Sequence, residues 1–232
     1  MCCEQVTYKH LTCAGKRLHE ALIDVENEGV AEVVDKYLQE CQLMSSLRHP
    51  NITQFLGLCF LPDTQLPLLV MERLETSLDE LLEHMPNLPL SLKRCVLEDV
   101  ASGLLCLHKR ASPVIHRDLT AKNVLLTSSL VAKITDMGNS RIIDIGRIAQ
   151  TLTKAPGTSV YMPPEALDDR HRYGPSLDIF SFGHLALFTL TQVSSLSFSR
   201  VCTHTIGCLR IHGKMQDKNG VSSLSRGYCL DS

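Results

Sequence analysis

The chain has 232 residues, of which 44% are hydrophobic, 23 are basic and 25 are acidic, so its formal net charge is −2. This near-neutral balance provides no basic field of the kind that binds nucleic acid, and we expect no nucleic-acid partner. The apolar content is sufficient for one large domain, or for two smaller lobes that each have a core.

The cysteines and the apolar runs indicate where such a protein would reside. Ten cysteines are spaced irregularly and mostly fall in apolar runs, as do Cys59 and Cys106. This pattern predicts buried, reduced thiols in an intracellular protein rather than a disulfide framework. The longest apolar stretch, 177–198, contains Asp178 and His184, which favours a buried helix over a membrane span. We therefore expect no membrane segment in this chain and a cytoplasmic location, either for the chain itself or for the part of a larger protein that it represents.

The first elements in chain order are strands and one helix. Short runs of Val, Thr, Tyr and Leu with turn residues predict two strands within 1–24. Apolar residues at helical spacing then predict a helix over 30–48, with either Tyr37 or Leu38 on its inner face. Pro50 follows, and proline disfavours continuation of a helix.

The next elements are two further strands and then two helices. The strand-like runs 52–61 and 66–74 are separated by the turn residues 62–65. The stretch 77–85 is typical of a helix that begins with a serine cap. Apolar residues at helical spacing predict a longer helix over 91–110.

The middle of the chain combines short apolar runs with polar residues. The segment 114–126 reads VIHRDLTAKNVLL, and 130–140 is predicted to be a strand pair that ends at Gly138. Strands with one helix thus come first, and helices with short embedded strands come second. This order predicts an α+β fold with two lobes and a cleft between them.

Polar side chains within 114–126 call for partners or for a chemical role, because burying them unsatisfied is costly. Asp118 and Asn123, together with Asp136 farther along the chain, offer carboxylate and amide oxygens. Such hard ligands suit Mg²⁺ carrying a phosphate ester. Taken singly, each residue is equally typical of an Asx turn, a cap or a solvated loop.

Four ordered motifs resemble those of protein kinases. HRDLTAKN at 116–123 resembles the catalytic loop, and DMG at 136–138 resembles the D-F-G motif. MPPE at 162–165 resembles A-P-E, with proline in place of alanine. DIFSFG at 178–183 is similar to the start of the central helix of the C-lobe.

Two motifs upstream extend this resemblance, so that it covers roughly residues 6–192 in family order. The stretch 38–52 resembles helix C and the loop that follows it, and CAGK at 13–16 resembles V-A-I-K. The resemblance implies a two-lobed kinase fold, with a small β-rich N-lobe that contains helix C and a larger, mainly helical C-lobe. The mixture of motifs is similar to the tyrosine-kinase-like group.

The resemblance also implies a role for each matching residue in the catalytic loop and the DMG motif. Asp118 would be the catalytic base, and Lys122 would stabilise the transferring phosphoryl group. Asn123 and Asp136 would hold Mg²⁺.

Other matching residues, most of them nearer the N-terminus, would bind the nucleotide. Lys16 would contact the α- and β-phosphates of ATP and pair with Glu40. The adenine would meet Ala14, the gatekeeper Met71, the backbone of Glu72 and Leu74, and Leu125. The side chains expected to form an apolar stack that links the lobes, anchored on Asp178, are Met44, Phe55, His116 and Met137.

The implied activity is transfer of the γ-phosphate of ATP to a protein substrate. GTSVYMPPE favours Ser/Thr as the acceptor, whereas Lys122 stands where tyrosine kinases place a basic residue, so Tyr stays an alternative. Phosphorylation in the activation segment could add a negative charge for Arg117 to bind. The hydroxyls that could carry it are those of Thr151, Thr153, Thr158 and Ser159.

The two ends of the chain depart from the family pattern. No G-x-G-x-x-G occurs in the sequence, and 193–232 matches no kinase motif. We therefore expect a kinase domain truncated at both ends, with an N-lobe at 1–72, a C-lobe at 73–192 and a divergent tail. Glu165 would lack its usual arginine partner. The alternative function is a catalytically impaired kinase-like fragment or pseudokinase that acts as a binding module.

Overall fold

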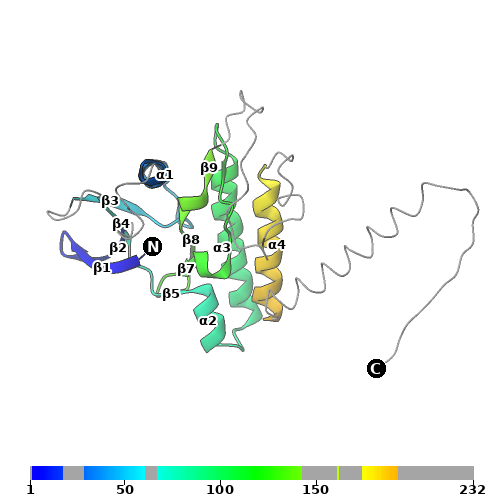
Figure 1. Cartoon of the computed structure of the whole chain (residues 1–232). Coiled ribbons are helices and arrows are strands. Elements are labelled where there is room, and N and C mark those ends of the chain that lie inside the picture. The colour runs from blue at the N-terminus through cyan, green and yellow to red at the C-terminus, as the bar shows by residue number, and fades with distance from the viewer. Residues whose placement is uncertain (1, 18–28, 61–66, 143–160, 162–173, 193–232) are drawn as a thin grey trace, which may run out of the picture. The chain divides into compact units, whose positions relative to one another are not determined.

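A four-stranded antiparallel sheet, in the order β1-β2-β4-β3, forms the first part of the fold (Figure 1). The structure is a computed structural model that describes residues 2–17, 29–60, 67–142, 161 and 174–192. The two strands expected within 1–24 and the two expected within 52–74 are all present. They are β1 (Cys2–Tyr8), β2 (Leu11–Arg17), β3 (Phe55–Cys59) and β4 (Leu68–Glu72).

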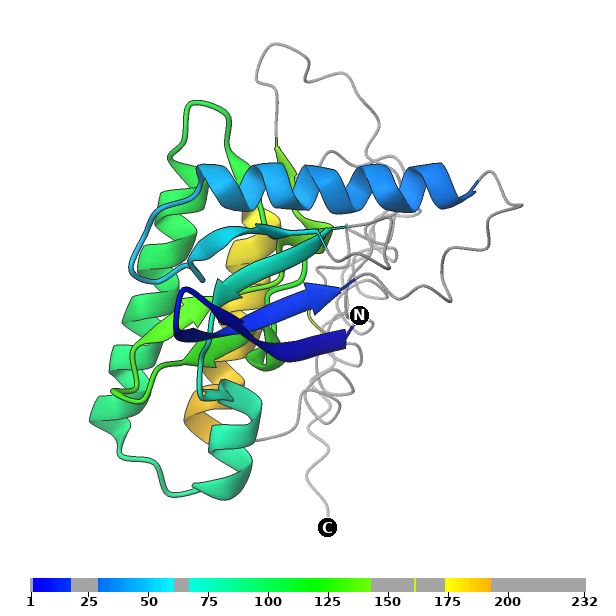
Figure 2. The same cartoon turned by 90° about the vertical axis from the view of Figure 1, so that its left-hand side faces the viewer.

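Helix α1 (Gly29–Ser46) lies alongside this sheet, next to β3 (Figure 2). Its inner face carries Tyr37, which is 2% exposed, whereas Leu38 is 45% exposed. This decides between the two residues that helical spacing alone left open. The helix ends before Pro50, as predicted.

Three helices dominate the second part of the fold, α2 (Leu78–His84), α3 (Leu90–His108) and α4 (Ser176–Thr191). The predicted serine cap of α2 is present: Ser77 and Glu80 form a reciprocal capping box. Helix α4 buries Leu177 and Leu185, which confirms the buried helix expected there as far as residue 191. Among the helices that the structure describes, none is long and apolar enough to cross a membrane.

Short strands lie between these helices. β5 (Thr76–Ser77), β7 (Val124–Leu126) and β8 (Ala132–Ile134) form one sheet, and β6 (Val114–Ile115) pairs with β9 (Arg141–Ile142). The single-turn 3₁₀ helices η2 (Ala121–Asn123) and η3 (Met137–Asn139) precede β7 and β9, respectively. The predicted strand pair within 130–140 is wrong. That stretch contains β8, and its partner is β7, because a turn closed by the Thr127 N–H and the Val131 carbonyl (3.0 Å) joins them.

One hydrophobic core runs from α1 into the helical part. Met44 and Met137 belong to this core cluster, and Phe55 packs against it. His116, the fourth side chain expected in the stack that links the lobes, is fully buried. The main chain of the loop after α1 approaches α3 so closely that a Cβ on Gly103 would lie 2.8 Å from a backbone oxygen. The α+β fold with a sheet-rich N-lobe and a helical C-lobe is therefore confirmed.

The expectation of buried thiols is only partly correct. Cys13 and Cys41 are buried, but Cys59 and Cys95 are exposed and Cys106 is half-buried. Cys59 is exposed because it ends β3, an edge strand of the sheet. The motif at 162–165 with Glu165, the candidate phosphorylation sites Thr151, Thr153, Thr158 and Ser159, and the tail at 193–232 lie outside the described residues.

Candidate active site

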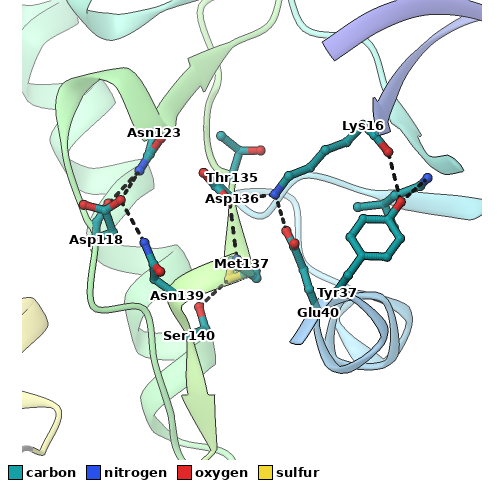
Figure 3. A network of polar contacts seen from close by, with 12 residues as sticks. Lys16, Tyr37, Glu40, Asp118, Asn123, Thr135, Asp136, Met137, Asn139 and Ser140 are labelled. Carbon is teal, nitrogen blue, oxygen red and sulfur yellow. Dashed lines mark hydrogen bonds and ion pairs between the residues drawn. The ribbon is translucent and has the colours of Figure 1, made fainter. Parts of the chain in front are cut away.

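Lys16 on β2 contacts two carboxylates, one on α1 and one in the helical part of the fold (Figure 3). Its Nζ lies 2.5 Å from Oε1 of Glu40 on α1 and 2.7 Å from Oδ1 of Asp136, which follows β8. Lys16 and Glu40 are each 4% exposed. The ion pair that the sequence predicts between Lys16 and Glu40 is therefore present, and Asp136 shares the same ammonium group.

These contacts set the charge of the three groups. Burial disfavours the charge on Lys16, but the carboxylates of Glu40 and Asp136 outweigh it together, so the pKa of Lys16 is raised. Burial also raises the pKa of Glu40, against the opposing influence of the Lys16 charge. For Asp136, burial is outweighed by the Lys16 charge and by hydrogen bonds, and its pKa is lowered. At neutral pH the site therefore holds a charged lysine against an ionised Asp136.

Asp118 and Asn123 lie together on the catalytic-loop segment. The Nδ2 of Asn123 donates to the Asp118 carbonyl (2.8 Å) and to Asp118 Oδ2 (3.3 Å). Asn139 donates to the same Oδ2 from the other side (3.3 Å). The Thr135 N–H donates to the Asn123 carbonyl (3.0 Å), which ties the residue before Asp136 to this loop. Hydrogen bonds thus connect Asp118 to Asn123 and Asn123 to Thr135, the residue next to Asp136 in the chain.

Asp178 on α4 holds the start of the same loop. Its fully buried carboxylate accepts the backbone N–H of His116 (2.8 Å) and of Arg117 (2.9 Å), and Nε2 of His108 lies 2.7 Å away. Arg117 and Asp136 both have left-handed backbone conformations, with φ of 70° and 62°. Such conformations are costly for residues other than glycine and collect at functional positions.

Three of the residues expected around the adenine, Ala14, Met71 and Glu72, lie on β2 and β4, whereas Leu74 follows β4 and Leu125 lies on β7. The strand register places Ala14 opposite Met71. The Glu72 N–H donates to the Gln54 carbonyl (3.0 Å), so it does not serve as a donor to a ligand. The Glu72 carboxylate accepts from Lys133 Nζ (2.8 Å), a contact that connects the end of β4 to β8.

An open pocket of about 520 Å³ lies where β5 and α2 face η2. It brings together Leu74, Lys122 and Leu125, three residues that the sequence predicts for the site. Lys16 and Asp136 do not line it, so this pocket covers only one side of the predicted nucleotide site. Its lining residues are Leu74, Glu75, Thr76, Ser77, Asp79, Glu80, Lys122 and Leu125.

The oxygen donors of Asp136 and Asn123 suit a hard divalent cation that also takes ligands from phosphate and water. No cluster of three His, Cys, Asp or Glu side chains that could hold a metal occurs in the part of the chain that the structure describes. Mg²⁺ does not require one, because it typically takes one or two carboxylates and completes its shell with phosphate oxygens and water. The carboxylate of Asp136 and the amide of Asn123 fit that role chemically.

Sequence reasoning missed several contributors to this site. His108, Lys133 and Asn139 each contact a residue that it had singled out. Asn139 directly follows the DMG motif, and its position there was the one available signal. His108 ends the helix α3 and Lys133 lies in the three-residue strand β8, and nothing in the sequence pattern separates either from surface residues.

Comparison with known proteins supports the resemblance of this chain to protein kinases. A model of the protein kinase domain matches residues 2–219. The chain is 30% identical over 191 residues to the dual specificity protein kinase shkC of Dictyostelium discoideum, a match that covers 81% of this chain and 37% of that protein. It is 33% identical over 150 residues to the human serine/threonine-protein kinase TNNI3K (64% of this chain, 18% of that protein). It is 32% identical over 174 residues to wall-associated receptor kinase 2 of Arabidopsis thaliana (72% and 23%).

These matches bear on the extent of the domain as well as on its family. The chain spans less than two fifths of the length of each of these relatives. The family match runs past residue 192 to 219. The boundaries expected for the N-lobe, the C-lobe and a divergent tail at 193–232 stay a prediction. Since the match covers most of the sequence and accords with the fold, the chain belongs to the protein kinase family.

Proposed function

We propose that this chain binds ATP with Mg²⁺ and transfers the γ-phosphate to a Ser or Thr hydroxyl of a protein substrate. The observation that carries the proposal is the contact of one buried lysine, Lys16, with both Glu40 and Asp136. In a protein kinase this arrangement aligns a phosphate-binding cation with a metal-binding carboxylate. Similarity to a serine/threonine-protein kinase supports the choice of acceptor, and similarity to a dual specificity protein kinase keeps Tyr as the alternative acceptor.

Lys16 would hold the α- and β-phosphates. Its raised pKa keeps the ammonium charged, and Glu40 orients it from α1. Ala14 and Leu125 would enclose the adenine ring, with Met71 at the back and the backbone of Leu74 at its edge. Because the Glu72 N–H is already bonded to Gln54, the carbonyl of Glu72 is the backbone group of this residue that we assign to the adenine.

Asn123 and Asp136 would hold Mg²⁺. Bound there, the ion would neutralise negative charge on the phosphates as it develops. The lowered pKa of Asp136 keeps its carboxylate ionised for that role. The Asn123 amide would use its oxygen for the metal, since its nitrogen donates to Asp118.

Asp118 would orient the substrate hydroxyl and accept its proton. Amides from Asn123 and Asn139 fix one oxygen of its carboxylate, which limits the directions that the group can take. Positioning of this kind supplies much of the catalysis when the transition state is loose. Lys122 is exposed beside this loop and would stabilise the transferring phosphoryl group.

The test is transfer of labelled γ-phosphate from ATP to a mixed protein substrate, followed by identification of the phosphorylated amino acid. We expect transfer that requires Mg²⁺, that labels Ser or Thr, and that is lost in Asp118→Asn. Asp35→Asn, which alters an exposed carboxylate on α1, is the matched control and should leave transfer unchanged. Stabilisation by Mg-ATP without transfer would instead support the binding-module alternative. Equal transfer by Asp118→Asn would refute the assigned base.

A further inference from the structure

The hydroxyl of Tyr37 lies within hydrogen-bonding distance of three backbone groups from two separate stretches of the chain; Figure 3 shows its contact with Lys16. The Leu69 N–H donates to this hydroxyl at 2.9 Å. The hydroxyl oxygen also lies 2.7 Å from the Pro67 carbonyl and 3.0 Å from the Lys16 carbonyl. Because a hydroxyl has one proton, it donates to one carbonyl at a time. Tyr37 is buried, so water does not replace these contacts.

The position of the hydroxyl matters because of the strand register. Lys16 on β2 and Leu69 on β4 are direct partners in the sheet. The Tyr37 hydroxyl therefore contacts the main chain of both members of one strand pair. A side chain of α1 thus contributes to the hydrogen bonding that joins β2 to β4, at the residue whose side chain forms the central ion pair.

Lys16 is consequently contacted by α1 at both of its ends. Tyr37 reaches its backbone carbonyl, and Glu40 reaches its Nζ. Tyr37 and Glu40 are three positions apart on the helix, a spacing that places side chains on the same face. Fixing the Tyr37 hydroxyl therefore fixes both the rotation of α1 and its displacement along its axis, the two movements that would carry Glu40 away from Lys16.

We propose that Tyr37 is a positioning residue, whose hydroxyl holds α1 against β2 and β4 so that Glu40 meets Lys16. This inference rests on the proposed function for its effect on catalysis, but its structural part does not depend on that function. The ring of Tyr37 belongs to the hydrophobic core in any case. The distinction to be tested is between a hydroxyl that only stabilises the fold and one that acts through Glu40.

The first test is Tyr37→Phe, which keeps the ring and removes the hydroxyl. We expect kcat/KM for ATP to fall about tenfold, the effect of losing roughly one hydrogen bond from the aligned state. Thr189→Val is the matched control, since it removes a fully buried hydroxyl that donates to the Leu185 carbonyl (2.7 Å) on α4. It should lower the melting temperature to a similar extent and leave kcat/KM unchanged. Equal kcat/KM for wild type and Tyr37→Phe would overturn the inference, as would a Tyr37→Phe chain that fails to fold where Thr189→Val folds.

The second test asks whether Tyr37 acts through Glu40. In a Glu40→Gln background, where the ion pair is already broken, adding Tyr37→Phe should change kcat/KM less than twofold. A purely structural hydroxyl would give the same fold-loss in both backgrounds, and that result would overturn the inference.

A third readout needs no catalysis and separates this inference from the proposed function. In Tyr37→Phe, the amide of Leu69 should exchange with solvent deuterium at least about tenfold faster than in wild type, because its acceptor is gone. The Leu69 amide in Thr189→Val should keep its wild-type rate. If wild type transfers no phosphate, the proposed function fails and the exchange rates alone decide the role of Tyr37. An unchanged exchange rate at the Leu69 amide would contradict the hydrogen bond from Leu69 to the Tyr37 hydroxyl.

Discussion

Lys16 and Asp136 are 120 residues apart in the chain, yet Nζ of the first lies 2.7 Å from Oδ1 of the second. One residue belongs to the four-stranded sheet and the other follows a strand of the helical part. Glu40 contacts the same ammonium from a third element, α1. Assembly of the site therefore requires that the sheet, α1 and the helical part are all folded and correctly placed.

Replacing this lysine should disrupt both stability and binding. In Lys16→Met the aliphatic stem is kept, but the buried Glu40 loses its cation and faces Asp136 without compensation. We expect a loss of about 3 kcal/mol in the free energy of unfolding, as for other broken buried ion pairs, together with loss of stabilisation by Mg-ATP. Urea unfolding with and without nucleotide measures both. Lys109→Met, at an exposed position after α3, is the control and should change neither the free energy of unfolding nor the stabilisation by Mg-ATP. Wild-type stability of Lys16→Met would show that the ion pair contributes little.

The same contacts predict a pH window. Because the pKa of Asp136 is lowered in the folded state, its contribution is present above its ordinary value of 3.8 and is lost as the pH falls through the folded pKa. Because the pKa of Lys16 is raised, its contribution is complete below its ordinary value of 10.5 and is lost as the pH rises through the folded pKa. The stability difference between wild type and Lys16→Met should be largest between neutral pH and the ordinary lysine value of 10.5. It should shrink as the pH falls, because the uncompensated Glu40 of the variant then takes up a proton, and it should shrink again as the pH rises through the folded pKa of Lys16. A difference that grows at alkaline pH would contradict this.

Two helix glycines should respond in opposite directions to alanine. A Cβ on Gly103 in α3 would lie 2.8 Å from the Asn51 carbonyl oxygen and 2.9 Å from Cδ1 of Ile134, whereas a Cβ on Gly183 in α4 would meet nothing within 4 Å. We expect Gly103→Ala to destabilise the fold by about 1–3 kcal/mol through overpacking. Gly183→Ala should stabilise it by about 0.5–1 kcal/mol, because alanine loses less conformational entropy in a helix. Thermal unfolding compares the two, and similar shifts in both would contradict the close approach of α3 to the loop after α1.

Asn139 should affect the chemical step rather than nucleotide binding. Its side-chain amide donates to Asp118 Oδ2, the carboxylate that we assign to the substrate hydroxyl rather than to the nucleotide. Asn139→Ala should lower kcat about tenfold by loosening the carboxylate, with KM for ATP unchanged. Asn87→Ala, in the exposed loop between α2 and α3, controls for the loss of an amide. A change in KM alone would show that Asn139 serves the nucleotide instead of Asp118.

Long periodic elements and ordered motifs were predictable from the sequence. The spacing of Leu92, Val96, Val100, Leu104 and Leu107 predicted α3; the last four are buried, and Leu92 is half-buried. The pairing of Lys16 with Glu40 followed from family motifs, and the structure places the two groups in contact. The sequence sufficed in these cases because the helix is determined by residues on one of its own faces, and the ion pair by residues at fixed places in family motifs.

Other features were not predictable because they depend on which main-chain groups meet in the folded protein. β7 and β8 have three residues each, too few for periodicity to distinguish them or to identify their partners. The partners of the Tyr37 hydroxyl are the backbone groups of Lys16, Pro67 and Leu69, and no residue type encodes them. Cys59 stands in an apolar run that suggests burial, but its exposure follows from its place on an edge strand.

The most direct test of a shared metal–nucleotide site is the affinity for ATP measured by calorimetry with and without Mg²⁺, in wild type and in Asp136→Asn. Wild type should bind ATP at least about tenfold more tightly with Mg²⁺ than without it, since the metal adds ligands from this chain to the phosphates. Asp136→Asn should lose that difference, while Asp35→Asn keeps it. ATP binding by wild type that is unaffected by Mg²⁺, or an undiminished Mg²⁺ effect in Asp136→Asn, would contradict a shared metal–nucleotide site at Asp136.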